Sequence, residues 1–188
     1  PGLAASEAWA LAVASTVTET ATAELVAPVG HRPTLVVERY DRRVVGERVT
    51  RLHQEDGCQV LGLAPESKYP RGVGPREASL LRIAKVLLAR GEDPIGELRR
   101  LLTQTVVNVA LLNTDAHAKN ISIVHGTAGT VTLSPMYDVV PAAWFVPTQA
   151  RVALPVGGKW RIVEIDRHHL VDEAASWGMP EPTAKDVV

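Results

Sequence analysis

The chain has 188 residues, which is long enough for one compact domain with a buried core. Hydrophobic residues make up 46% of it and the formal net charge is −1, values typical of a soluble globular protein. Basic and acidic residues are interleaved, which argues against direct contact with nucleic acid. No apolar run approaches the length of a membrane span. The single cysteine, Cys58, cannot form an internal disulfide and suits a reducing compartment, so we expect a cytoplasmic protein without a membrane partner.

The pattern of the first part of the chain predicts a helix, two strands, a second helix and a loop. Residues 4–24 are rich in alanine, with apolar positions at helical spacing, and predict a helix. Residues 23–29 and 34–39 predict two short strands around a turn. Residues 51–62 predict a second helix, and the prolines and glycines of residues 65–75 predict a loop.

The remainder predicts three helices and a hairpin. Residues 77–90 are amphipathic and predict a helix. Asp93 caps a helix over residues 94–112, whose second half is apolar on nearly every side and should be central to the core. Residues 151–165 predict a hairpin across two glycines, followed by a last helix over residues 167–177.

The stretch most informative about function follows the central helix. A polar loop at residues 113–120 leads into two β-rich segments, residues 121–125 and 130–134, and these lead to Tyr137 and Asp138. A hairpin of this kind brings its exit strand back beside its entry, so polar groups at both ends can converge.

The loop carries Asp115, His117 and Asn120 in the spacing Asp-x-His-x-x-Asn, which this composition would produce about 0.004 times by chance. Phosphoryl transfer needs a carboxylate to orient the attacking hydroxyl and two oxygen-bearing side chains to hold Mg²⁺. Asp115 can be the first, and Asn120 with Asp138 can be the others. The alternative is a solvated loop whose Asp and Asn side chains bond their own backbone. Asp138, which is flanked by apolar residues, favours the catalytic interpretation.

This stretch resembles the catalytic segment of HipA-like serine/threonine kinases, the toxins of type II toxin–antitoxin systems. The motifs are NTDAHAKN at residues 113–120 and LSPMYDVV at residues 133–140. Residues 35–42 and 51–70 match two further family segments in the same order. The resemblance implies an α+β, mainly helical fold, a protein-kinase-like C-lobe with part of the N-lobe and hinge strands.

The resemblance also implies a division of the chain. Residues 1–42 would be a remnant of the N-lobe and hinge, and residues 43–188 would be the helical catalytic lobe. Kinases need a lysine on an early strand and a loop over the phosphates, and residues 1–38 contain neither a lysine nor a glycine-rich loop. Family members carry both in an N-terminal half, so we expect a fragment whose isolated activity is weak or absent.

The cofactors implied by the resemblance are ATP and Mg²⁺. Asp115 would accept or orient the proton of a serine or threonine hydroxyl, and His117 would approach the transferring phosphoryl group. Asn120 and Asp138 would hold Mg²⁺.

The segment at residues 34–39 would be the kinase hinge. The backbone of Glu38 and Tyr40 would contact adenine. Asp41 would reach the ribose hydroxyls, or alternatively form a salt bridge with Arg42 or Arg43 at the end of the strand.

Further residues have two interpretations each. Glu7 would pair with the ATP-positioning lysine, or would only be a favourable charge in a first helical turn. Lys119 would contact phosphate, or would pair with a nearby acid, which we favour. His53 and Glu55 could be structural pins beneath the catalytic loop.

The implied partners are a HipB-like DNA-binding antitoxin, DNA only through that antitoxin, and a protein substrate in translation such as an aminoacyl-tRNA synthetase. Two alternatives remain open. Small-molecule phosphotransferases of the aminoglycoside or choline type use the same Asp-x-His-x-x-Asn spacing, although the hinge and RLHQED segments argue against them. A non-catalytic interaction domain is the other, and the intact Asp115, Asn120 and Asp138 argue against it.

Overall fold

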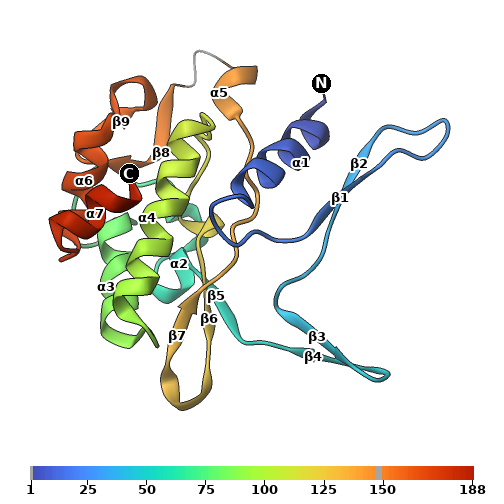
Figure 1. The fold of residues 1–188 in the computed structure, drawn as a ribbon, viewed down its shortest axis with the longest axis horizontal. Coiled ribbons are helices and arrows are strands. Elements are labelled where there is room, and N and C mark those ends of the chain that lie inside the picture. The colour runs from blue at the N-terminus through green and yellow to red at the C-terminus, as the bar shows by residue number, and fades with distance from the viewer. Residues whose placement is uncertain (1, 147–149) are drawn as a thin grey trace.

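The computed structural model describes residues 2–146 and 150–188, in which helices pack together with small antiparallel sheets (Figure 1). The helices are α1 (Leu3–Ala14), α2 (Gly57–Val60), α3 (Leu80–Arg90), α4 (Pro94–Ala110), α5 (Ala142–Phe145), α6 (Arg167–Ser176) and α7 (Glu181–Val187). The strands are β1 (Ala23–Val26), β2 (Thr34–Val37), β3 (Arg42–Val45), β4 (Arg48–Arg51), β5 (Gln54–Asp56), β6 (Ser122–His125), β7 (Val131–Leu133), β8 (Arg151–Val156) and β9 (Lys159–Arg161). The arrangement is α+β, as the sequence predicts.

Helix α4 is the centre of the helical part (Figure 1). It begins after Asp93, whose side chain accepts a hydrogen bond from the Gly96 amide, and Pro94 fits the first helical position because it has no amide hydrogen to satisfy. Its buried face packs against α3, α6, α7 and β7. The main hydrophobic cluster contains Leu98, Leu101 and Leu102 of this helix, all fully buried. The prediction of a core helix starting at residue 94 is confirmed.

A three-stranded antiparallel sheet with β6 in the middle lies against these helices. Strand β6 pairs with β5 through Glu55 and Ile123, and with β7 through Ile123 and Leu133. Ile123 and Leu133 are buried in the main cluster. The predicted hairpin between residues 121 and 134 is therefore confirmed, and it returns the chain toward Tyr137 and Asp138.

A second, smaller cluster fixes α1 beside the end of this hairpin. Its buried members are Ala10, Leu11, Ala14, Val107, Met136 and Val139. Backbone hydrogen bonds join Met136 to Glu19 and to Ala21. The chain after α1 is thus held alongside Met136, two residues before Asp138.

Two antiparallel ribbons, β1–β2 and β3–β4, project from this body (Figure 1). The strands predicted at residues 23–29 and 34–39 are confirmed, although both are shorter. The predicted helix at residues 4–24 ends at Ala14, because a run of threonine and valine follows and these β-branched residues lose rotamer freedom in a helix. Ribbon β3–β4 was not predicted from the sequence.

The predicted helix over residues 51–62 is wrong. Gln54, Glu55 and Asp56 form strand β5, and only Gly57–Val60 are helical. The Asp56 side chain accepts hydrogen bonds from the amides of Cys58 and Gln59, so it caps the short helix from outside. The hairpin at residues 151–165 and the last predicted helix are confirmed in outline, while α7 was not predicted. No helix in the described residues is long and apolar enough to cross a membrane.

Gly57 is required by close packing between α2 and the loop at residues 113–120. A Cβ atom at this position would lie 2.5 Å from the carbonyl oxygen of Ala118, and the Gly57 amide donates to the Ile121 carbonyl. We predict that Gly57→Ala lowers the free energy of unfolding by about 1–3 kcal/mol because backbone must move, as measured by urea denaturation. Gly72→Ala is the control, since a Cβ atom there has no neighbour within 4 Å. Equal stability of the two variants would contradict the prediction.

Candidate active site

The loop at residues 113–120 is fixed at the C-terminal end of α4. Leu112 has a φ of 58°, and the amides of Leu112 and Asn113 donate to the carbonyls of Val109 and Asn108. This is the hydrogen-bond pattern of a Schellman motif, which ends a helix sharply. The buried Asn113 side chain then donates to the Asn108 side chain and accepts from the Asp115 amide. The helix terminus thereby sets the position of Asp115.

The Asp115 carboxylate is exposed and accepts one hydrogen bond from a side chain far away in the sequence. The Tyr69 hydroxyl lies 2.6 Å from Asp115 Oδ1. Burial, together with this hydrogen bond and the charge of Asp115, raises the pKa of Tyr69 to about 12. Tyr69 is therefore protonated at neutral pH and donates to Asp115, which leaves the second carboxylate oxygen for another donor.

His117 is buried beside Lys68. Its Nε2 atom lies 2.9 Å from Lys68 Nζ, and its ring meets the Tyr69 ring edge-on with centroids 5.2 Å apart. Burial first, and the positive charge of Lys68 second, lower the pKa of His117. Because an ammonium group can only donate, Nε2 must accept and the proton of the neutral ring is on Nδ1. In the described part of the chain, Nδ1 is buried without a hydrogen-bond partner.

Asn120 and Asp138 approach the same region from two directions. The Asn120 side-chain amide donates to the Asp115 carbonyl, 3.2 Å away. Asp138 is exposed and has a φ of 55°, a conformation that costs energy for a residue with a side chain and is enriched at functional sites. Its negative charge contributes to raising the pKa of Tyr69 and opposes the lowering of the His117 pKa. Asp115, His117 and Asn120 thus share one loop, and Asp138 follows Tyr137, whose hydroxyl bonds the Lys119 carbonyl of that loop.

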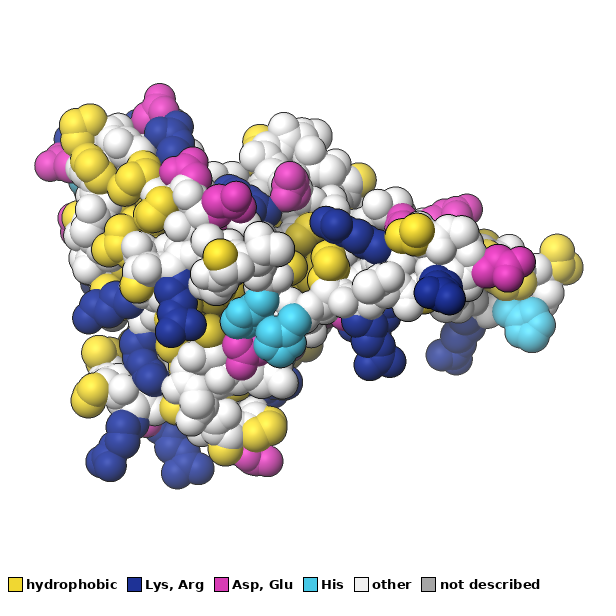
Figure 2. Space-filling model, turned by 90° about the horizontal axis from the view of Figure 1, so that it is seen from below, with side chains coloured by type: hydrophobic (Ala, Val, Ile, Leu, Met, Phe, Trp, Pro, Cys, Tyr) yellow, Lys and Arg dark blue, Asp and Glu magenta, His cyan; other side chains and the backbone are white. Residues whose placement is uncertain are grey.

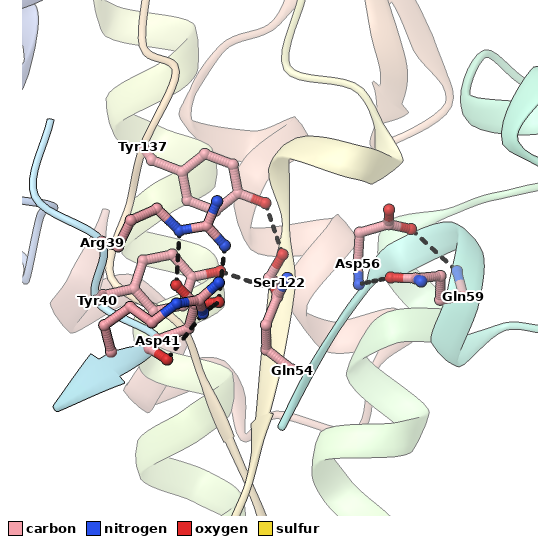
Figure 3. A network of polar contacts seen from close by, with 9 residues as sticks. Arg39, Tyr40, Asp41, Gln54, Asp56, Gln59, Ser122 and Tyr137 are labelled. Carbon is pink, nitrogen blue, oxygen red and sulfur yellow. Dashed lines mark hydrogen bonds and ion pairs between the residues drawn. The ribbon is translucent and has the colours of Figure 1, made fainter. Parts of the chain in front are cut away.

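Lys119 pairs with an acid, as we favoured from the sequence. Its ammonium group bonds the Asp56 carboxylate, which also caps α2. The Lys119 carbonyl accepts a hydrogen bond from the Tyr137 hydroxyl at 2.8 Å. That hydroxyl also lies 2.6 Å from Ser122 Oγ (Figure 3), and burial raises the pKa of Tyr137. These contacts tie the loop to β5 on one side and to the segment before Asp138 on the other.

The predicted hinge residues lie next to Tyr137. The Tyr40 ring stacks on the Tyr137 ring with centroids 5.7 Å apart, and its hydroxyl donates to the Gln54 side chain (Figure 3). The Glu38 amide donates to the Thr22 carbonyl. Within the described residues the Glu38 carbonyl and the Tyr40 amide have no hydrogen-bond partner, so both can serve a ligand.

Asp41 forms a salt bridge, which was one of its two predicted alternatives. Of its two partners, Arg42 was predicted and Arg39 was not. The carboxylate is buried and bonds the guanidinium groups of Arg39 and Arg42, not that of Arg43 (Figure 3). The Arg39 hydrogen bond is the main reason why the pKa of Asp41 is lowered to about 2. A role at the ribose remains a prediction.

Glu7 lies on α1 and is partly buried. The first turn of α1 contains no acidic residue, so the interpretation of Glu7 as a first-turn charge is wrong. Partial burial raises the pKa of Glu7, and the charge of Asp138 raises it further. Pairing of Glu7 with an ATP-positioning lysine stays a prediction.

Comparison with known proteins identifies the family. The model of the HipA-like C-terminal domain matches residues 1–188. This chain belongs to the HipA-like C-terminal domain family. Y4mE of Sinorhizobium fredii, which carries a kinase name, is 36% identical over 136 residues, covering 72% of this chain and 31% of Y4mE.

The serine/threonine-protein kinase toxin HipA of Shewanella oneidensis is 29% identical over 160 residues, covering 80% of this chain and 37% of the toxin. The chain thus spans about a third of the length of these relatives. A solved structure of Shewanella HipA with HipB and operator DNA matches with a TM-score of 0.86 at 26% identity, covering 98% of this chain and 45% of that one.

The Helicobacter pylori proinflammatory kinase CtkA matches in fold alone. Its TM-score is 0.60 at 9% identity, and the match covers 100% of this chain and 82% of CtkA. These structural matches confirm the predicted kinase-like α+β fold.

Several residues around the candidate site were not predicted from the sequence. Lys68 and Tyr69 lie in a segment that was assigned as a loop, although that segment is part of the family match. An open pocket beside Asp115 is also lined by Arg151 and Trp160, with the Arg151 guanidinium 4.0 Å from the centre of the Trp160 ring. The sequence predicted the hairpin that carries Arg151 and Trp160, but not that the hairpin lies beside Asp115. The Ala153 amide, which donates to the Thr114 carbonyl, holds it there.

We predict that the His117 ring titrates below its ordinary value of 6.5 when followed by NMR. Because the unfolded chain then binds this proton more tightly than the folded one, the free energy of unfolding should decrease as the pH falls from 6.5 to the folded pKa. Lys68→Met should raise the midpoint of the His117 titration, because it removes a neighbouring positive charge. Lys185→Met, which removes an exposed lysine paired with Glu181, should leave it unchanged. A midpoint unaffected by Lys68→Met would contradict the assigned cause.

Proposed function

We propose that this protein is the hinge and catalytic lobe of an ATP- and Mg²⁺-dependent serine/threonine protein kinase. The observation that carries the proposal is that Asp115, His117 and Asn120 share the loop after α4, while the Tyr137 hydroxyl, one residue before Asp138, bonds the Lys119 carbonyl of this loop. Membership in the HipA-like family and the kinase names of its relatives support the same reaction class. Residues 1–42 would be the remnant of the N-lobe and hinge, and residues 43–188 the helical lobe.

Asp115 is proposed to orient the acceptor hydroxyl and take its proton. Tyr69 bonds one carboxylate oxygen and so leaves Oδ2 to face a substrate hydroxyl. Asp115 is exposed in the pocket that Arg151 and Trp160 also line, so a segment of a substrate protein can approach Asp115. His117, a neutral ring, would approach the transferring phosphoryl group.

Asn120 and Asp138 offer an amide oxygen and a carboxylate, which are hard oxygen ligands and suit Mg²⁺. When bound, Mg²⁺ neutralises charge on the nucleotide phosphates. Glu38 and Tyr40 would bind adenine through their free backbone carbonyl and amide. The stack of Tyr40 on Tyr137, the residue before Asp138, supports a hinge next to the proposed Mg²⁺ site.

The proposed partners rest on a structural relative for the antitoxin and on the family resemblance for the substrate. Shewanella HipA occurs in a complex with HipB and operator DNA, which supports a HipB-like antitoxin as a partner and contact with DNA through it. A cytoplasmic protein of translation, such as an aminoacyl-tRNA synthetase, is the proposed substrate.

We predict that a non-hydrolysable ATP analogue binds only in the presence of Mg²⁺, as measured by calorimetry on this chain and on the same chain carrying its natural upstream residues. Asp138→Asn should abolish the Mg²⁺-dependent binding because it removes a charged metal ligand. Asp115→Asn should leave binding intact, since Asp115 is assigned to the acceptor.

The matched control is Asp172→Asn, an exposed aspartate on α6, which should bind like the unchanged protein. Absence of binding to the extended chain would refute the kinase proposal and favour a non-catalytic interaction domain. Equal effects of Asp115→Asn and Asp138→Asn would refute the separation of their roles.

A further inference from the structure

Three side chains that can bind a metal gather on strands β5 and β6, outside the candidate active site. His53 immediately precedes β5, Glu55 lies within it, and His125 is the last residue of β6. The pairing of Gln54 with Val124 places His53 opposite His125, whose amide donates to the His53 carbonyl. Residues two apart on a strand share a face, so Glu55 lies beside this pair of histidines.

The three side chains are close enough for one ion. His125 Nε2 lies 2.7 Å from Glu55 Oε2, and the rings of His53 and His125 have centroids 4.4 Å apart. One ligand atom from each residue lies within 4.8 Å of the others. Ligands around a tetrahedral zinc ion are about 3.3 Å apart, given zinc–nitrogen bonds of about 2.0–2.1 Å. Small side-chain rotations therefore suffice to surround an ion.

We propose that His53, Glu55 and His125 form a binding site for one Zn²⁺ ion. Two imidazole nitrogens and one carboxylate oxygen are a donor set typical of zinc and unlike the oxygen ligands of Mg²⁺ or Ca²⁺. His53 is exposed and the other two side chains are half-buried, so an ion can enter from solvent and water can complete the coordination. Figure 2 shows two histidine side chains side by side, with an acidic side chain next to them, on the face seen from below.

A bound ion would connect two parts of the chain that meet at this sheet. Strand β4 ends at Arg51, two residues before His53, so the site lies at the base of the β3–β4 ribbon. Strand β6, which ends at His125, follows directly on the loop at residues 113–120. Zinc would therefore fasten the base of the ribbon to the hairpin that leaves the candidate catalytic loop, and this does not depend on the proposed kinase activity.

The test uses protein without a histidine tag and Zn²⁺ alone as the ligand. Calorimetry should give one equivalent of Zn²⁺, and the melting temperature should rise with zinc concentration because the ion binds the folded state. Co²⁺ should give the absorption bands of a four-coordinate site. In the unchanged protein, NMR signals of the His53 and His125 rings should shift on addition of Zn²⁺, while that of His31 on the β1–β2 ribbon should not.

His53→Asn and His125→Asn should each weaken zinc binding roughly 10-fold or more, because each removes more than about 1.4 kcal/mol of ligand interaction. Glu55→Gln keeps the size of the side chain and should also weaken binding. His168→Asn, on α6, is the matched control, and Asp138→Asn should bind zinc normally, which separates this site from the proposed Mg²⁺ site.

Absence of a stoichiometric zinc signal in the unchanged protein would overturn the proposal, as would undiminished binding in the folded His53→Asn and His125→Asn variants. Ring shifts confined to histidines other than His53 and His125 would overturn it as well. Circular dichroism of each variant without metal verifies the fold, and the NMR result on the unchanged protein needs no variant.

Discussion

The sharp end of helix α4 is the constraint on which the candidate active site depends. Leu112 accepts a left-handed backbone, which costs a non-glycine residue about 1–2 kcal/mol. The energy is offset by hydrogen bonds from the Leu112 and Asn113 amides and by burial of the Asn113 side chain between Asn108 and Asp115. Since α4 packs against α3, α6, α7 and β7, it gives the loop a rigid base. The end of α4 therefore fixes the position of Asp115 and of the residues after it.

The segment that carries Asp138 is held by contacts between parts of the chain that are remote in sequence. Met136 is joined to the chain after α1, and Tyr137 bonds Ser122 and the Lys119 carbonyl. Between these restraints and the buried Val139, Asp138 adopts its positive φ. A backbone held in this way can present a carboxylate to a ligand at a fixed place, which is the property that a metal-binding aspartate requires.

The sequence predicted what depends on local chemistry. The α4 helix follows from its cap and apolar spacing, and the hairpin follows from its β-branched segments. An acidic partner for Lys119 was favoured, but the sequence did not identify Asp56, which lies 63 positions away. The error at residues 51–62 arose because Asp56 was placed inside a helix that it caps from outside. Lys68 and Tyr69 could not be assigned to the site because their contacts with His117 and Asp115 join residues 49 and 46 positions apart. Periodicity carries no information about such contacts.

The polar side chains of strand β5 have specific partners on both faces of the sheet. Neighbouring residues on a strand point to opposite faces. Asp56 therefore turns toward Lys119 and the cap of α2, while Glu55 turns toward His125 on the other face. One short strand thus supports the candidate catalytic loop with one carboxylate and contributes the other to the proposed zinc site. Because both carboxylates belong to adjacent residues, a change in the pairing of β5 with β6 would displace the two sites together.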